Sequence, residues 1–414
     1  MRRLVPLLAL AGLLAGCSTR ERANPFDPRN PNTSGRPSGF VALAGNAYVR
    51  LRWQRVEGGT LIGYQLFRRG IFESTYQPIT GVLSTPVTEF LDVPLSNGYD
   101  YSYRLYFVFA SGLGARPAED LATPGFAVPW LVEAGGTDAV RVTADGRHVA
   151  ERVGGFEGNN DVAVNPTDGT VWVSDNSRGQ VVVLNPSTGV RTTVPVSRPT
   201  AIAVDPYNGT AWVCDLSTNA VYHFRPQGDP STFPISGVQQ PIDAAVDVND
   251  GSVWICERSG NWVSRHNGSA DLIWRTASAA PSRVAVDSTT RNGWVTSFTR
   301  GTVTRIDVSG QPLDTLSGFS TPVGIAIDAR RGRIWVADPG SGEVIALRRD
   351  GSQEFRIPGL PDAGEVSVDV RSGDAWVVLG NPGELLRIAP TGFVRQRLGG
   401  LNVPIAVAVD PNGH

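Results

Sequence analysis

The 414-residue sequence contains no lysine, so arginine supplies all 37 of its Lys+Arg positions. This absence excludes Schiff-base chemistry and the phosphate-binding lysine of P-loop proteins. With 39 acidic residues, the formal net charge is −2, and no basic surface for nucleic acid is expected. Histidine is scarce as well, at His148, His223, His266 and His414. None of these has a partner at metal-ligand spacing, and no Gly-x-Ser-x-Gly motif accompanies them.

Cysteine occurs at three positions, too few for a disulfide framework. Cys214 and Cys256 each lie two residues after a tryptophan in equivalent segments of the chain. We expect small buried thiols, because equivalent positions on neighbouring sheets usually exceed the Cα separation of about 7 Å that a disulfide allows. A disulfide between them is the alternative in an oxidising compartment.

No apolar run is long enough to cross a bilayer, which takes about 20 helical residues. The run Leu4–Leu14 spans 11 residues after two arginines, the order typical of a secretory signal. It leads into Leu14-Ala15-Gly16-Cys17, which resembles the lipobox of bacterial lipoproteins. The resemblance implies a signal peptide over residues 1–16 and a diacylglycerol on Cys17; a plain signal peptide is the alternative. Because Ser18 follows Cys17, it also implies an outer-membrane anchor, on the periplasmic face or the cell surface.

Two further segments precede the longest part of the chain. Residues 17–37 are polar, rich in Pro and Asn and without periodicity, so we expect a lipidated, extended tether. Residues 38–124 alternate apolar and polar positions, as in AYVRLRWQ (Ala47–Gln54), which predicts half-buried strands. Trp53 and the stretch NGYDYSYRL, with Tyr101 in the place of a tyrosine corner, resemble a fibronectin type III domain. The resemblance implies a β-sandwich, and we expect it to act as a spacer.

The remainder of the chain is a repeat with a period close to 41 residues. Tryptophans recur 40 to 42 residues apart, at Trp130, Trp172, Trp212, Trp254, Trp294, Trp335 and Trp376. Turn residues that end a short apolar run recur at the same spacing, at Asn165, Asp205, Asp247, Asp287, Asp328, Asp369 and Asp410. Each unit contains four strand-like stretches, which predicts one four-stranded sheet per repeat and hence a β-propeller.

The first and last units are incomplete in complementary ways. The unit of Trp130 lacks a first strand, and the unit of Asp410 lacks a tryptophan strand. We therefore expect the C-terminal strand to pair with three strands that begin near residue 128, with Val407 beside Leu131. This pairing closes seven blades over residues 128–414 and leaves no long unpaired edge. The predicted fold class is all-β, an N-terminal sandwich followed by a closed seven-bladed β-propeller.

The units resemble NHL and YVTN-type propellers, including virginiamycin B lyase-like and gluconolactonase-like members. The stretches PTAIAVDPYNGTAWVCD and TPVGIAIDARRGRIWVADPGSGEVIALRRDG carry the resemblance. In the lyase-like members catalysis is attributed to a histidine with acidic partners, and no histidine here maps onto such a position. We interpret the repeated tryptophans as packing between blades rather than as a cofactor site. The residue two positions before each turn residue is small, as expected where first strands converge on an axis.

Charged residues stand four positions before the turn residues, where the first strands should face an axial funnel. Asp161, Asp243 and Glu365 are acidic and Arg283 is basic. Three carboxylates around a funnel could hold Ca²⁺ or orient a polar ligand, because hard cations take oxygen ligands. The alternative is that these are solvated rim residues or ion pairs. Acids also follow five of the tryptophan strands, and we expect them to fix the turn that comes next.

These features favour a binding and scaffolding lipoprotein over an enzyme. We expect the loop residues Arg178, Arg258 and Arg300 to contact an envelope protein or glycan, and Cys17 to hold the chain at the membrane. A metal-dependent lactonase or lyase in the funnel is the first alternative, and a purely structural envelope component is the second. No nucleic-acid partner is expected.

Overall fold

The computed structural model describes residues 23–134, 136–231 and 233–413. Residues 1–16, where a signal peptide is expected, and Cys17 therefore lie outside the described residues. Within those ranges, every regular element is a β-strand except one short 3₁₀ turn, η1 (Asn176–Arg178). The same ranges include no helix that is both long and apolar enough to cross a membrane. The described residues divide into two compact units, one of residues 23–41, 52–89 and 102–120, the other of residues 42–51, 90–101 and those from 121 to 413.

Two antiparallel sheets form between residues 41 and 122. One has the order β1 (Val41–Ala44), β2 (Val49–Arg52) and β6 (Glu89–Asp92). The other has the order β4 (Gln77–Pro78), β3 (Leu61–Gly70), β7 (Tyr101–Phe109) and β8 (Gly112–Leu113), with β5 (Leu83–Ser84) paired to β3 and β9 (Ala118–Ala122) paired to β7. Alternate residues of β3 and β7 are buried, among them Tyr64, Leu66, Tyr103, Leu105 and Phe107. The period-two pattern of the sequence therefore does mark one buried face.

Two aromatic residues singled out in this region have defined partners. Trp53 is buried, and its ring centroid lies 5.6 Å from that of Tyr64. The hydroxyl of Tyr101 accepts a hydrogen bond from the backbone N–H of Ser96 at 3.2 Å. Both side chains therefore hold neighbouring strands and loops in place.

The described part of the expected tether is not extended. Residues 25–35 form successive turns, with Asn30 buried and its amide donating to the carbonyl of Asn24. Phe26 packs edge-on against Phe107 and Phe109, with ring centroids 5.0 and 5.3 Å apart. An apolar ring gains by leaving water, so Phe26 helps to pack this otherwise polar segment against the rest of the first unit.

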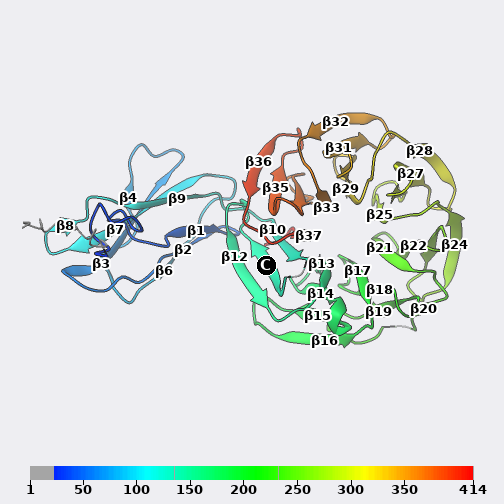
Figure 1. Ribbon diagram of the computed structural model, residues 1–414, viewed down its shortest axis with the longest axis horizontal. Helices are drawn as coiled ribbons and strands as arrows, with labels where there is room; N and C mark the ends of the chain where they lie inside the picture. Colours follow the sequence, from blue (N-terminus) through cyan, green and yellow to red (C-terminus); the bar gives the residue numbers. More distant parts are fainter. Residues whose placement is uncertain (1–22, 135, 232, 414) are drawn as a thin grey trace, which may run out of the picture. The chain divides into compact units, whose positions relative to one another are not determined.

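The second unit contains seven four-stranded antiparallel sheets within its described residues, arranged as a ring in Figure 1. Six are continuous in sequence: β13 (Asn159–Val164) to β16 (Arg191–Pro195) through β14 (Val171–Asp175) and β15 (Gln180–Leu184); β17 (Pro199–Val204), β18 (Ala211–Asp215), β19 (Ala220–Phe224) and β20 (Ile235–Ser236); β21 (Pro241–Asp247), β22 (Ser252–Glu257), β23 (Trp262–His266) and β24 (Leu272–Ala277); β25 (Arg283–Val286), β26 (Gly293–Ser297), β27 (Thr302–Ile306) and β28 (Pro312–Leu316); β29 (Gly324–Asp328), β30 (Arg333–Asp338), β31 (Glu343–Arg348) and β32 (Gln353–Pro358); β33 (Ala363–Val368), β34 (Ala375–Leu379), β35 (Glu384–Ile388) and β36 (Val394–Leu398).

The remaining sheet joins the two ends of this unit. Its order is β12 (Val149–Gly154), β11 (Asp138–Val142), β10 (Val128–Glu133) and β37 (Pro404–Asp410). Leu131 lies opposite Val407 in the antiparallel ladder, as the sequence predicts. The first strands of successive sheets contact one another around the whole ring, from β13 through β33 to β37 and back to β13.

Each tryptophan of the repeat packs against the sheet that follows its own. Trp172, for example, shares a core cluster with Ile202 and Val213 of the next sheet. Trp376, in the last continuous sheet, packs with Leu131 and Val140 of the sheet that β37 completes. The expectation of packing between repeats is thus confirmed. In every sheet the small residue of the first strand lies directly opposite the tryptophan: Ala163, Ala203, Ala245, Ala285, Ala326, Ser367 and Ala408.

On the third strand of several sheets, the residue opposite the tryptophan is an arginine, which the sequence pattern alone did not suggest. Trp254 lies opposite Arg265, whose guanidinium carbon is 5.8 Å from the indole centroid and whose Nη1 donates to the carbonyl of Val308 in the next sheet at 2.8 Å. Trp294 with Arg305 and Trp376 with Arg387 repeat this arrangement, each arginine donating to a turn carbonyl of the following sheet. The sequence signal is an arginine 11 residues after the tryptophan.

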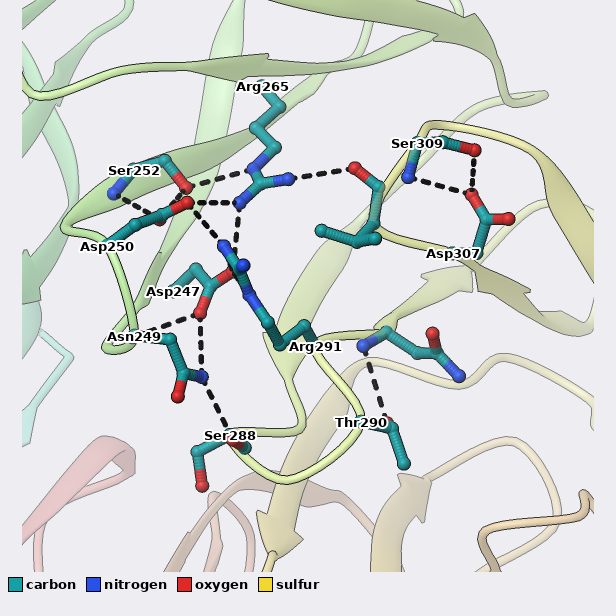
Figure 2. A network of polar contacts seen from close by, with 12 residues as sticks. Asp247, Asn249, Asp250, Ser252, Arg265, Ser288, Thr290, Arg291, Asp307 and Ser309 are labelled. Atoms are coloured by element: carbon teal, nitrogen blue, oxygen red, sulfur yellow. Dashed lines mark hydrogen bonds and ion pairs between the residues drawn. The ribbon is translucent and has the colours of Figure 1, made fainter.

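Figure 2 shows the most extensive of these contacts. Arg265 is 3% exposed and binds Asp247, Asp250 and Ser252 of its own sheet. Arg291, from the turn between β25 and β26, reaches back to both aspartates. Two guanidinium groups therefore neutralise two carboxylates while joining adjacent sheets, and the buried charge of Asp247 is compensated as a buried charge must be.

Candidate functional site

Four charged residues occupy one level of the first strands. Asp161 lies on β13, Asp243 on β21 and Glu365 on β33, and Arg283 begins β25. We call these four residues the axial cluster. They come from four different sheets, separated by up to about 200 residues of sequence, and only the ring of first strands brings them together.

The two aspartates join neighbouring first strands. Asp161 Oδ2 accepts the backbone N–H of Ile202 on β17 at 2.7 Å, and its Oδ1 accepts the N–H of Val162 at 2.9 Å. Asp243 Oδ2 accepts the N–H of Val284 on β25 at 2.7 Å. Asp161 is 6% exposed and Asp243 9%. These carboxylates therefore satisfy backbone donors between sheets instead of standing free at a solvated rim.

Arg283 links the remaining members of the axial cluster. Its Nη1 lies 3.3 Å from Asp243 Oδ1, and its Nη2 lies 3.7 Å from Glu365 Oε2. The side chains of Arg283 and Glu365 are 28% and 25% exposed, against 13% for the side chain of Asp243. Glu365 Oε2 has no hydrogen-bond partner within the described residues. Arg283 therefore forms an ion pair with Asp243 and lies near Glu365 without a hydrogen bond to Oε2.

Glycine at the equivalent position of β29 lets the strands approach. A Cβ on Gly324 would lie 2.3 Å from the carbonyl oxygen of Gly364 and 3.2 Å from the Cα of Glu365. A side chain at this position would therefore force β29 and β33 further apart. Gly324 thus sets the distance at which Glu365 enters the axial cluster.

Burial dominates the electrostatics of the cluster. It raises the pKa of Asp161 to about 7, against the opposing charge of Arg283. It raises the pKa of Glu365 to about 8, and the negative charge of Asp161 adds to this. The pKa of Asp243 is raised as well, by burial and against the charge of Arg283. Burial lowers the pKa of Arg283, but Asp243, Glu365 and Asp161 outweigh it and the pKa is raised overall. At neutral pH Glu365 is therefore mostly a neutral acid that can donate a hydrogen bond.

The carboxylates do not form a metal-ligand set. Among the residues that the structure describes, no group of three or more His, Cys, Asp or Glu side chains is placed to hold a metal ion. Asp161 and Asp243 point lone pairs at backbone N–H groups, and a guanidinium lies beside Asp243 and Glu365. A hard cation needs several free oxygens, and this arrangement offers few.

A cavity of about 290 Å³ opens beside Arg283. Its lining residues are Ile242, Arg258, Ser282, Arg283, Phe298 and Val323, which lie at the ends of β22 and β26 and the starts of β21, β25 and β29. We call it the Arg258 cavity. Phe298 is 46% exposed, and Arg258 is exposed and forms no ion pair within the described ranges. The cavity thus combines an apolar wall with one guanidinium that is free to bind.

The other expected loop arginines lie outside this cavity. Arg178 binds Glu157 at 2.8 Å and lies 3.8 Å from Asp175. Arg300 is exposed and lines no part of the Arg258 cavity. Of the three loop arginines, the structure brings only Arg258 next to a member of the axial cluster.

The acids after the tryptophan strands mainly hold the loop that precedes a first strand, not the turn that follows them. Asp175 accepts the N–H of Glu157, and Asp338 accepts those of Ser320 and Thr321. Glu133 accepts the N–H of Asn402, which precedes β37. The N–H group that each acid accepts therefore belongs to a residue 17 or 18 positions earlier in the chain. Glu133 is the exception, because β37 completes its sheet from the C-terminal end. Asp215 does both, since it also accepts the N–H of Ser217.

Histidine and cysteine have structural positions. The ring of His223 stacks on Trp212 with centroids 3.9 Å apart, and burial lowers the pKa of His223 to about 4. Burial also lowers the pKa of His266, whose Nδ1 lies 3.3 Å from the carbonyl of Ala270. Cys214 and Cys256 are free and buried, and burial raises both thiol pKa values well above the ordinary value. His414 lies outside the described residues.

Comparison with known proteins identifies the fold but no family. No protein-family model matches the chain, and no curated protein matches it in sequence. Virginiamycin B lyase from Staphylococcus aureus superposes with a TM-score of 0.52 at 15% identity, over 61% of this chain and 92% of that one. Hydrazine synthase from Kuenenia stuttgartiensis gives 0.54 at 16%, over 62% and 90%. A functionally unknown protein from Desulfotomaculum acetoxidans DSM 771 gives 0.57 at 13%, over 68% and 98%. The chain is thus an all-β protein whose repeated four-stranded sheets share the propeller fold of virginiamycin B lyase-like structures.

Proposed function

We propose that the chain is an outer-membrane lipoprotein that binds an envelope protein or glycan through one face of a seven-bladed propeller. In this proposal the seven four-stranded sheets are the blades, and residues 38–124 form a fibronectin type III-like domain. Acyl chains on Cys17 hold the molecule at the membrane, each buried CH₂ contributing about 0.8 kcal/mol. The stretch Leu14-Ala15-Gly16-Cys17 supports the anchor, and the contacts of Trp53 and Tyr101 support the domain assignment.

The Arg258 cavity is the observation that carries the binding function. It places an unpaired guanidinium, an exposed phenylalanine and the partly exposed Arg283 on one concave surface. Arginine and aromatic residues in partly enclosed positions supply most of the binding energy at protein interfaces. At about 290 Å³ the cavity has room for one side chain or one sugar of a larger partner. An acidic group on that partner would pair with Arg258.

The alternative, a metal-dependent lactonase or lyase, has weaker support. The axial carboxylates are engaged by backbone N–H groups and Arg283, so the set fits a catalytic metal poorly. The raised pKa values of Asp161 and Glu365 would allow proton exchange near neutral pH. Both oxygens of Asp161, however, accept backbone N–H groups, that of Ile202 on the next first strand and that of Val162 on its own, which favours a structural role for that carboxyl.

The test uses the full-length protein with a photo-crosslinking group at residue 298, expressed in its native host cells. The set of crosslinked envelope components is compared by quantitative mass spectrometry for the starting protein, Arg258→Ser and the matched control Arg300→Ser. We expect one dominant partner, retained by Arg300→Ser and reduced about tenfold by Arg258→Ser, because a lost charge-assisted contact costs about 1.4 kcal/mol or more. An identical crosslinked set for all three proteins would refute the binding face. Metabolic labelling with palmitate, lost in Cys17→Ser, tests the anchor separately.

A further inference from the structure

The outer face of the six-stranded sheet carries a second concave site, away from the residues used above. Phe67 and Arg69 alternate with the buried Tyr64 and Leu66 along β3, and Arg104 and Tyr106 alternate with buried residues of β7. Because side chains of a strand point to opposite faces in turn, these four share the face turned away from the core.

These residues line a hollow of about 500 Å³. Its lining is completed by Ser74, Thr75 and Tyr76, which precede β4, and by Leu113 of β8. We call it the arginine–tyrosine hollow. Three aromatic rings and a leucine make its apolar part, while two hydroxyl side chains and the phenol oxygens of Tyr76 and Tyr106 make its polar part.

The two guanidinium groups flank one tyrosine. The guanidinium carbon of Arg104 lies 4.0 Å from the ring centroid of Tyr76, and that of Arg69 lies 5.0 Å from it. Phe67 and Tyr106 meet edge to face at 5.3 Å. Stacking on Tyr76 orients both guanidinium groups, so less rotamer freedom remains to be lost when a ligand binds.

The charge of the hollow is not balanced by its own residues. Arg104 pairs with Glu119 at 2.8 Å, but no acidic side chain pairs with Arg69 within the part of the chain that the structure describes. A planar guanidinium matches a carboxylate with two parallel hydrogen bonds. The hollow therefore calls for an anionic ligand that also presents apolar C–H faces and hydroxyl groups.

We infer that the arginine–tyrosine hollow binds a saccharide whose sugar rings carry carboxylate groups. A sugar ring can lie against Phe67 or Tyr106 while its hydroxyls reach Ser74 and Thr75 and its carboxylate reaches Arg69. A peptide strand is favoured less, because the edge of β3 that it would extend is already paired with β4 and β5. A small inorganic anion would use the guanidinium groups but none of the rings.

Isothermal titration of the full chain with a galacturonic acid trisaccharide tests the inference. The neutral galactose trisaccharide, a triglutamate peptide and inorganic phosphate are titrated in parallel. We expect the acidic trisaccharide to bind at least about tenfold more tightly than the neutral one, as for one charge-assisted hydrogen-bonded pair. Binding should weaken in 0.5 M salt, where the screening length falls to about 4 Å.

Variants locate the site. Arg69→Ser should weaken binding of the acidic trisaccharide about tenfold, and Tyr76→Leu should weaken it as well, since Tyr76 orients both guanidinium groups. Arg55→Ser is the matched control: it removes an arginine of the same unit that pairs with Glu57 and lines no part of the hollow. Arg258→Ser should also leave this binding unchanged, which separates the site from the proposed propeller face. Near-ultraviolet circular dichroism confirms that each variant is folded.

Several results would overturn the inference. Equal binding of the neutral trisaccharide would remove the role of charge, and tighter binding of triglutamate would make the hollow a site for acidic peptides. Full competition by phosphate would reduce it to an anion site without sugar recognition. Absence of heat with every probe, or an unchanged affinity of Arg69→Ser, would leave no saccharide site.

Discussion

The replacement Glu365→Gln should remove a loss of stability that the native chain suffers as the pH rises. Glutamine matches the neutral acid in shape, so below about pH 4.5, where the carboxyl is protonated in the folded and the unfolded chain alike, the variant should be about as stable as the starting protein. Burial raises the pKa of Glu365 to about 8 in the folded chain, from an ordinary value of 4.5. The native state therefore keeps a proton that the unfolded state has released.

The sign and size of the effect follow from this proton. Because the folded pKa is the higher one, the stabilisation is complete below about pH 4.5 and is lost as the pH rises through about 8. Between those limits the free energy of unfolding falls by about 1.4 kcal/mol per pH unit. The fall stops near pH 8, so the range from pH 6 to pH 9 includes about two pH units of it, or about 2–3 kcal/mol. The Glu365 side chain is only 25% exposed, so solvent screening reduces this value little.

The assay is urea unfolding at pH 6 and pH 9, followed by the fluorescence of the buried tryptophans. The starting protein should lose about 2–3 kcal/mol more than Glu365→Gln between the two pH values. Asp161, with a pKa near 7, adds a loss in the same direction that both proteins share. Glu151→Gln, at an exposed position of β12, is the matched control and should behave as the starting protein. Equal pH dependence in Glu365→Gln and the starting protein would refute the assignment of a neutral Glu365.

Three further predictions concern the sheets. Arg265→Leu should lower the free energy of unfolding by about 3 kcal/mol in urea titrations, because Asp247 is fully buried and would keep Arg291 as its only cationic partner; an unchanged midpoint would show that Arg265 is dispensable. Cys214 and Cys256 should not react with a thiol reagent at pH 8 until the chain unfolds, since both are buried with raised pKa values; reaction at the rate of a free thiol would contradict their burial. Deletion of residues 402–414 removes β37 and exposes the edge of β10, so we expect aggregation in size-exclusion chromatography; a monomer with the original melting temperature would refute closure through this strand.

Much of the architecture could be predicted because its signals are local or periodic. The tryptophans recur every 40 to 42 residues, and the missing strands at the two ends are complementary. These two facts led to the pairing of Leu131 with Val407, which the ladder contains. The same pattern marked the small residues of the first strands, but their position opposite the tryptophans came from the register alone.

For the candidate site, the sequence predicted which residues belong to it but not which contacts they make. The sequence placed Asp161, Asp243, Arg283 and Glu365 at one level, but it could not show that both aspartates would accept N–H groups of the next first strand. It also did not predict the fold of residues 25–35 around Phe26, because one aromatic residue in a polar segment has no periodicity. The arginine–tyrosine hollow was missed for another reason: its residues come from four separate stretches of the chain.

By itself the sequence determined the strand pattern, the repeat and the way the two ends complete one sheet, since these depend on residues that are neighbours in the chain or one period apart. The tertiary structure alone decided which charges are buried, which carboxyl stays protonated and which arginine remains free. Those properties depend on the angle and distance between sheets, which set the desolvation of each group and the donors within its reach. A change of a few ångströms between β25 and β33 would leave the repeat intact and separate Arg283 from Glu365.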